Sequence, residues 1–97
     1  MISELQKNVI INTIMPFHPV RIGIFGSMAR GENTENSDID ILYQLKDTVG
    51  LFNIVRMKDS LEENLNKKVD LVSEKYIHPK LKPYIMSDLT IIYSDEE

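Results

Sequence analysis

The chain has 97 residues, a net charge of −4 and no cysteine. This size and composition predict one small soluble domain over residues 1–97, and they exclude disulfide scaffolds, cysteine-ligated zinc and thiol chemistry. No apolar run is long enough to span a membrane, no basic stripe indicates binding to duplex nucleic acid, and the first residues lack the order of a signal peptide. The expected location is therefore the cytoplasm.

The chain is predicted to contain three helices and four strands. Apolar residues recur at helical spacing near the N-terminus and in the middle of the chain, and short apolar segments between them have the character of strands. Pro, Gly and Asn interrupt these segments and predict turns. In chain order, we expect a helix over 1–15, a strand over 20–25, a turn over 26–36 with room for one helical turn after Ser27, a strand over 37–44, a helix over 51–66, a strand over 69–73, a short helix over 79–87 and a strand over 89–93.

Two of the predicted helices carry clear local signals. Ser3 stands three residues before Gln6, which is the spacing of a capping box at a helix start. The helix in the middle of the chain has one apolar face, which is predicted to pack on the core. This face comprises Ile54, Met57, Leu61 and Leu65. The order of the elements predicts an α/β or α+β fold, with helices packed on a small mixed sheet.

Acidic residues stand at unusual places in two of the predicted strands. Asp38 and Asp40 are two residues apart, so on a strand their side chains share a face and can converge on one point. Two carboxylates at such a short distance repel each other unless solvent, a raised pKa or a cation offsets their charge. Asp70, between Val69 and Leu71, suits a core strand only if its face opens beside the other two acids. Carboxylate oxygens are ligands of Mg²⁺, which in proteins often binds substrate phosphates as well.

Gly26 and Ser27 follow the first predicted strand. Glycine lets the backbone turn tightly and approach a ligand, and the first N–H groups of a turn that begins at Ser27 would favour an anion. A phosphate held there would lie beside a cation held by the acids, which is the layout that nucleotidyl transfer needs. Each feature is common by itself, because D-x-D pairs, Gly-Ser turns and surface residues such as Arg30 occur in many unrelated proteins.

Together these residues make a more specific pattern. The run GSMARG at 26–31, followed by SDID at 37–40, matches G-S-x(10)-D-x-D. This pattern resembles the nucleotidyltransferase superfamily that shares the DNA polymerase β catalytic fold. Within it, the chain is similar to the minimal nucleotidyltransferases (MNT) of HEPN/MNT toxin–antitoxin pairs. Asp70 stands where that family places its third acid, and the resemblance covers the whole chain.

The resemblance implies a polymerase β-like fold and a role for each matching residue. Asp38 and Asp40 would ligate two divalent metal ions, Mg²⁺ or alternatively Mn²⁺. Asp70 would complete the second metal site and help to deprotonate the attacking hydroxyl, and Arg30 would support the phosphate loop. The nucleotide-binding residues would be Gly26, Ser27 and Arg30.

The resemblance also implies an activity and a partner. A nucleoside monophosphate, expected to be AMP from ATP, would be transferred to a hydroxyl with release of pyrophosphate. The expected acceptor is a tyrosine of a HEPN-type toxin, so that the chain would be an antitoxin. Two alternatives remain open: a binding subunit that neutralises its partner by occlusion, and a subunit of a small-molecule nucleotidyltransferase that modifies antibiotics. The residues do not specify the nucleotide preference, the number of nucleotides added or the oligomeric state.

The small size of the chain has a further implication for the acceptor. With no residues left for a lid or a second domain, the chain is expected to need a macromolecular acceptor that supplies the missing wall of the cleft. Aromatic side chains are the candidates for that docking surface, although most of them are expected to pack in the core. They are Tyr43, Phe52, Tyr84 and Tyr93.

Overall fold

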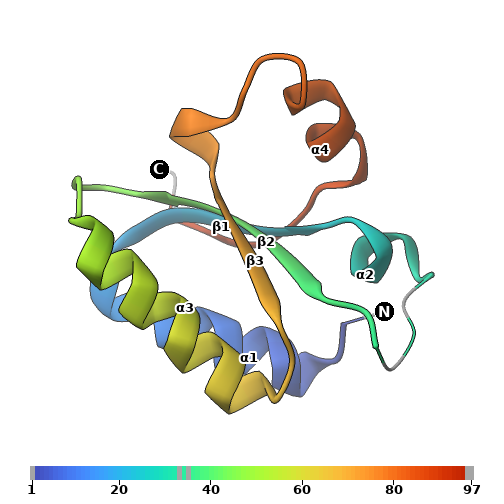
Figure 1. Cartoon of the computed structure of the whole chain (residues 1–97), viewed down its shortest axis with the longest axis horizontal. Coiled ribbons are helices and arrows are strands. Elements are labelled where there is room, and N and C mark those ends of the chain that lie inside the picture. The colour runs from blue at the N-terminus through green and yellow to red at the C-terminus, as the bar shows by residue number, and fades with distance from the viewer. Residues whose placement is uncertain (1, 33, 35, 96–97) are drawn as a thin grey trace.

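A computed structural model of the protein describes residues 2–32, 34 and 36–95. These residues form four α-helices, two short 3₁₀ helices and four strands. In chain order they are α1 (Glu4–Ile14), η1 (Met15–Phe17), β1 (Pro19–Phe25), α2 (Ser27–Arg30), β2 (Ile39–Leu45), α3 (Leu51–Leu65), β3 (Val69–Ser73), η2 (Glu74–Tyr76), α4 (Lys82–Asp88) and β4 (Thr90–Ser94) (Figure 1). Positions 1, 33 and 35 of the predicted first helix and first turn lie outside the described residues.

Local sequence signals determine several of the helix ends. The Ser3 hydroxyl accepts a hydrogen bond from the Gln6 N–H at 3.1 Å, and the Gln6 side chain accepts one from the Ser3 N–H at 2.9 Å, which confirms the capping box. Helix α3 ends at Leu65, and its C-cap, Asn66, has a left-handed backbone (φ 53°), which asparagine tolerates. Pro83 lies in the first turn of α4, where its missing N–H breaks no helical bond. The helix therefore begins at Lys82 and not at the predicted residue 79.

The strands form one mixed sheet in the order β3-β2-β1-β4. Strand β1 pairs antiparallel with β2 and β4, whereas β2 and β3 run parallel to each other. A parallel pair needs a crossover connection, which α3 provides between β2 and β3. The predicted fold class, helices on a small mixed sheet, is confirmed.

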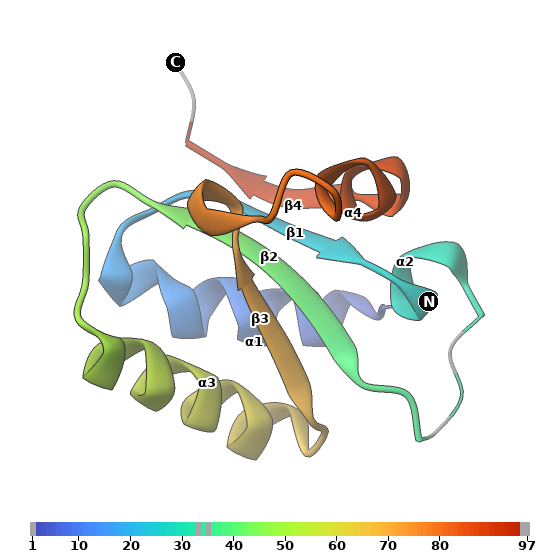
Figure 2. The same ribbon diagram turned by 45° about the horizontal axis from the view of Figure 1, so that its top comes forward.

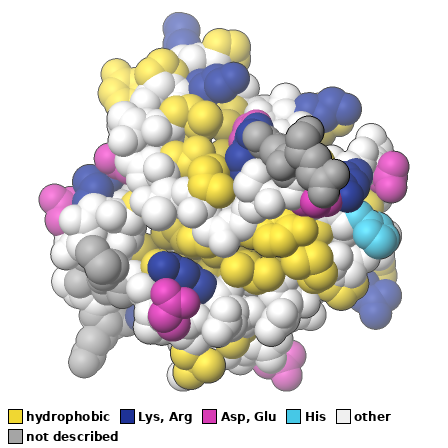
Figure 3. Space-filling model, turned by 180° about the vertical axis from the view of Figure 1, so that it is seen from behind, with side chains coloured by type: hydrophobic (Ala, Val, Ile, Leu, Met, Phe, Trp, Pro, Cys, Tyr) yellow, Lys and Arg dark blue, Asp and Glu magenta, His cyan; other side chains and the backbone are white. Residues whose placement is uncertain are grey.

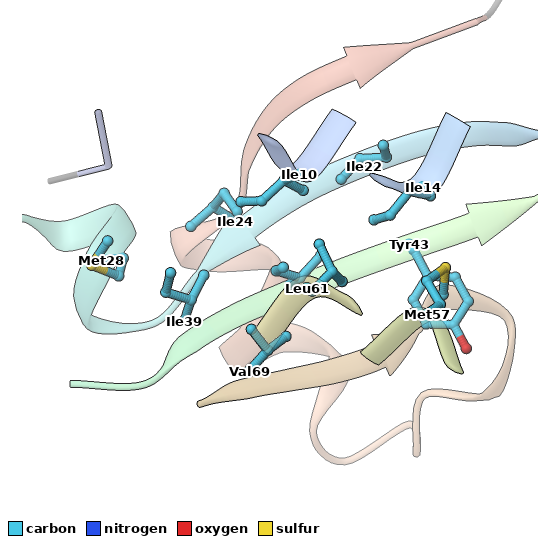
Figure 4. Packing of buried hydrophobic residues seen from close by; sticks show 11 residues of the cluster. Ile10, Ile14, Ile22, Ile24, Met28, Ile39, Tyr43, Met57, Leu61 and Val69 are labelled. Carbon is cyan, nitrogen blue, oxygen red and sulfur yellow. The ribbon is translucent and has the colours of Figure 1, made fainter. Parts of the chain in front are cut away.

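Helices α1 and α3 cover one face of the sheet, and α4 lies on the other (Figure 2). Figure 4 shows the core, in which side chains of the two helices and the strands point toward one another. In α3, Met57 and Leu61 are buried, and Ile54 and Leu65 pack at the edge of the core, so the predicted apolar face is confirmed. The buried cluster comprises Ile10, Ile14, Ile22, Ile24, Met28, Ile39, Ile41, Tyr43, Met57, Leu61 and Val69.

The start of β2 differs from the sequence prediction. The strand begins at Ile39, two residues later than expected, so Asp38 lies just outside it. Ser37 is held in a local turn: its N–H donates to the Thr34 carbonyl at 3.1 Å, and its hydroxyl accepts from the Thr34 N–H at 2.8 Å. Such short-range bonds compete with strand pairing, which explains the later start. None of the helices in the described part of the chain has the length and apolar character needed to cross a membrane.

Candidate active site

Asp40 and Asp70 are neighbours on the two parallel strands. Their Cα atoms are partners in the β2–β3 register, where adjacent strands lie about 4.8 Å apart. Ile39, Ile41 and Val69, which flank the two acids along the strands, point into the core beneath α1 and α3. Because side chains alternate along a strand, both carboxylates lie on the opposite face of the sheet. The sheet therefore brings two of the three predicted acids together.

Asp38 is placed differently from the sequence prediction. It is exposed and lies one residue before the start of β2, whereas the sequence predicted it inside the strand. Its charge still acts on Asp40, whose pKa it raises. Among the residues that the structure describes, no group of three or more His, Cys, Asp or Glu side chains is arranged to hold a metal ion. Asp40 and Asp70 are register partners, and the charge of Asp38 also acts on Asp40.

The surroundings of Asp40 disfavour its negative charge. Burial of the carboxyl group raises its pKa above the usual value, and the negative charges of Asp70 and then Asp38 raise it further, against the opposing effect of Arg30. A nearby cation would relieve this unfavourable arrangement. Carboxylate oxygens are the ligands that hard divalent ions prefer, so the donors present here fit Mg²⁺, with coordination positions left for other oxygen ligands.

Gly26 brings the backbone close to Asp40. Its φ is 74° and its ψ is −152°, a conformation that residues with side chains rarely adopt. A Cβ atom at this position would also overlap Oδ2 of Asp40. Glycine is therefore needed at position 26 for two reasons: the backbone conformation and the close approach to the acid.

Helix α2 is a single turn that follows Gly26, as the sequence predicted. The Gly26 carbonyl accepts a hydrogen bond from the Arg30 N–H at 3.1 Å and closes the turn. Met28 is 2% exposed and packs in the core, which anchors the turn to the sheet. The N–H groups at the start of a helical turn have no partner within the turn, and this applies to the N–H of Ser27, which begins α2 just after the end of β1.

Arg30, the last residue of α2, joins two carboxylates. Its Nε donates to Glu32 Oε1 and its Nη1 donates to Asp88 Oδ2, both at 2.6 Å. Hydrogen bonds from the guanidinium to Glu32 and then Asp88 raise the pKa of Arg30 above its usual value, so its positive charge is secure. The sequence prediction did not include Asp88, because it lies 58 residues from Arg30 and no motif spacing connects the two.

A separate cavity of about 560 Å³ lies between the end of β2, the start of α3 and the segment after β3. Tyr43, Leu51 and Tyr76 are among its lining residues. None of the predicted site residues lines this cavity. The acids and the Gly26 turn instead lie at the other end of β2, on an open part of the surface.

Sequence and structure comparisons identify relatives of this chain. Residues 7–97 match the family model described as polymerase beta, nucleotidyltransferase. A candidate protein adenylyltransferase of Methanocaldococcus jannaschii is 43% identical over 88 residues, which cover 90% of this chain and 92% of the relative. The protein adenylyltransferase MntA of Thermococcus cleftensis is 31% identical over 71 residues, 73% of this chain and 72% of the relative. A crystal structure of a toxin–antitoxin with AMP-PNP has a TM-score of 0.83 at 25% identity, covering 93% of this chain and 74% of that chain.

The chain therefore belongs to the polymerase β nucleotidyltransferase family, and it has the fold of that family. The resemblance based on the G-S-x(10)-D-x-D pattern is confirmed. The matched region contains all the predicted site residues, which are Gly26, Ser27, Arg30, Asp38, Asp40 and Asp70.

Proposed function

We propose that this chain is a cytoplasmic, metal-dependent protein adenylyltransferase that transfers AMP from ATP to a tyrosine of a HEPN-type toxin and so acts as its antitoxin. The main support is that Asp40, Asp70 and the Gly26 turn meet on one open face of the sheet. The names of the relatives support protein adenylylation, and the toxin–antitoxin crystal structure with AMP-PNP supports a nucleotide and a toxin as the two binding partners.

The proposal assigns the nucleotide to the turn after β1. Gly26 allows the triphosphate to come close to the backbone, and Ser27 donates hydrogen bonds to it from its N–H and its hydroxyl. Arg30 adds a positive charge at the end of the same turn. The adjacent acids then lie beside the phosphates, because Gly26 is in contact distance of the Asp40 carboxylate.

The acids have two tasks in this proposal. Asp38, Asp40 and Asp70 hold the divalent metal, which is either two Mg²⁺ ions or Mn²⁺ instead of Mg²⁺. When bound, the metal neutralises the negative charge of the phosphates and orients them. We expect Asp38, exposed and outside β2, to complete the ligand set only when metal and nucleotide are present. Asp70 also accepts the proton of the tyrosine hydroxyl. The tyrosine oxygen then bonds to the α-phosphorus, the bond to the bridging oxygen breaks, and pyrophosphate leaves.

Intact-mass measurement tests this function directly. The chain, ATP and Mg²⁺ are incubated with a molar excess of the cognate HEPN-type toxin. We expect one or more AMP additions on a toxin tyrosine, lost in EDTA and in Asp40→Asn. Asp59→Asn is the matched control, because Asp59 is an exposed acid on α3, away from the proposed site, and its loss should not affect transfer.

The same experiment separates the alternatives. A tight complex without a mass change, together with full neutralisation of the toxin by Asp40→Asn, would favour occlusion and refute the enzymatic function. AMP transfer to an antibiotic in the absence of toxin would favour the small-molecule enzyme.

Two glycines allow a matched test of the nucleotide turn. Gly26 and Gly31 both have φ 74°, but a Cβ at Gly31 would meet no atom within 4 Å. Gly31→Ala should have a backbone penalty of about 1–2 kcal/mol, because Gly31 is in the left-handed region (ψ 19°). Gly26→Ala should have a larger penalty, because ψ −152° at this φ is essentially limited to glycine, and only its Cβ would collide with the Asp40 carboxylate. We expect calorimetry to show loss of Mg²⁺-ATP binding in Gly26→Ala alone. Equal ATP affinity in the two variants would contradict the assignment of the triphosphate to this turn.

A further inference from the structure

A single cation connects the turn after β1 with the end of α4. Arg30 closes α2 and its Nη1 donates to Asp88, the last residue of α4, at 2.6 Å. Figures 1 and 2 both show α2 and α4 close together at the same end of the sheet. The ion pair therefore spans two elements that are distant in sequence.

The end of α4 is itself held on the sheet. Leu89 directly follows Asp88, and its side chain fills the space above Gly23 of β1, where a Cβ atom would lie 2.5 Å from Leu89 Cδ1. Asp88 thus extends from a backbone that is anchored on β1, and its side chain is 25% exposed. An anchored and partly buried carboxylate can restrict the guanidinium that it binds.

The two acidic partners of Arg30 differ in whether they connect it to another element of the fold. Glu32 is two residues from Arg30 in the chain and 64% exposed, so it moves with the turn itself. Asp88 is 58 residues away, on a different element. Loss of Glu32 removes a local, solvent-screened contact, whereas loss of Asp88 removes the connection between the turn and the sheet-anchored helix.

We propose that Asp88 is a positioning residue for the nucleotide: by binding Arg30 it holds the guanidinium, and with it the α2 turn, in the orientation that receives the triphosphate. This inference rests on the proposed nucleotidyl transfer. An arginine side chain has five N–H donors in a fixed plane, of which the bonds to Glu32 and Asp88 use two. A guanidinium held by Asp88 can therefore still donate to a phosphate oxygen.

The kinetic consequence follows from where Arg30 acts. A contact with phosphates that is made equally in the ground state and in the transition state changes KM more than kcat. Misplacing one charge-assisted hydrogen bond corresponds to about a tenfold change in affinity. A general loss of folded protein would instead lower the apparent kcat and leave KM unchanged.

The test measures KM and kcat for ATP in AMP transfer, together with Mg²⁺-ATP affinity by calorimetry. Asp88→Ala should raise the KM and the Kd for ATP about tenfold while kcat stays within about threefold. Glu32→Ala is the matched control and should stay within about twofold of the native chain for both constants. Asp88→Glu, which keeps the carboxylate, should recover most of the affinity. Asp88→Asn replaces the Ala variant if that protein fails to fold.

The outcomes distinguish this inference from the function on which it rests. An unchanged KM in the Asp88 variants, or equal defects in Asp88→Ala and Glu32→Ala, would refute the positioning role and leave the transfer activity intact. No ATP binding by the native chain would refute the proposed function, and the positioning role with it.

Discussion

Asp40 lies between two fully buried isoleucines of β2, yet its own side chain lies on the opposite face of the sheet, beside Asp70 of the neighbouring strand. The strand needs Ile39 and Ile41 for the core, and the alternation of side chains then turns residue 40 to the open face. The burial of the carboxyl group and the neighbouring charges raise its pKa. The unbound protein is therefore destabilised by a charge that a cation would stabilise.

This conflict predicts a pH-dependent gain in stability for Asp40→Asn. The pKa of Asp40 is higher in the folded than in the unfolded chain, so the carboxylate disfavours folding when the pH is above both values. The disadvantage disappears as the pH falls below the pKa of the unfolded state. Without metal, Asp40→Asn should have a higher Tm than the native chain at neutral pH, and the difference should shrink in acid.

Thermal melts with and without Mg²⁺ and ATP test this expectation. Ligands that bind only the folded state should raise the Tm of the native chain and not that of the variant. A lower Tm of Asp40→Asn in metal-free neutral buffer would indicate that the carboxylate has a structural role.

Helix α3 packs against the core with only one stripe of its surface. Met57 and Leu61 are 1% and 0% exposed, whereas Leu51 and Phe52 at its start are 79% and 76% exposed. The helix has no side-chain hydrogen bond at its N-cap, Gly50, so its stability depends mainly on packing against α1 and the sheet.

Two leucines of α3 give a matched test of this dependence. Leu61→Ala should lower the free energy of unfolding by about 2–5 kcal/mol, because it removes buried methyl groups and leaves a cavity. Leu51→Ala should change it by less than about 0.5 kcal/mol, since that side chain is largely in water. Denaturant titration measures both values, and similar losses in the two variants would contradict the packing in this helix.

The whole molecule has two unlike sides: α1 and α3 cover one face of the sheet, and α4 lies on the other (Figure 2). Asp40 and Asp70 are on the same face as α4, because the residues that flank them point into the core. The view from behind shows hydrophobic side chains gathered in a band across the middle of the surface (Figure 3). Exposed apolar surface of this kind often marks a protein interface. Of the four aromatic residues considered for docking, Tyr43 and Tyr93 belong to or pack against the core, whereas Phe52 and Tyr84 are exposed.

Phe52 and Tyr84 are suited to a paired test of how the toxin docks. Their side chains are 76% and 75% exposed, but Tyr84 is on α4, which is joined to the proposed nucleotide turn, and Phe52 is at the start of α3. If the acceptor covers the site, Tyr84→Ala should weaken toxin binding about tenfold or more and Phe52→Ala should not. Both variants should keep the native Tm. Calorimetry with the toxin decides, and the reverse order of effects would place the interface at α3.

The local features of this fold could be predicted from the sequence. The capping box at Ser3, the apolar face of α3 and the bounds of β3 depend on residues a few positions apart. The G-S-x(10)-D-x-D pattern also lies within a short segment, and it was sufficient to predict the family. Short-range patterns carry this information because helix caps, strand alternation and tight turns are determined by neighbouring residues.

Only the tertiary structure decided how these parts meet. The pairing of Asp40 with Asp70 depends on the register of two strands separated by α3, and the ion pair of Arg30 with Asp88 joins residues 58 positions apart. Such contacts arise from the packing of whole elements, where the choice between partners is made by the burial of the shared core and not by spacing along the chain.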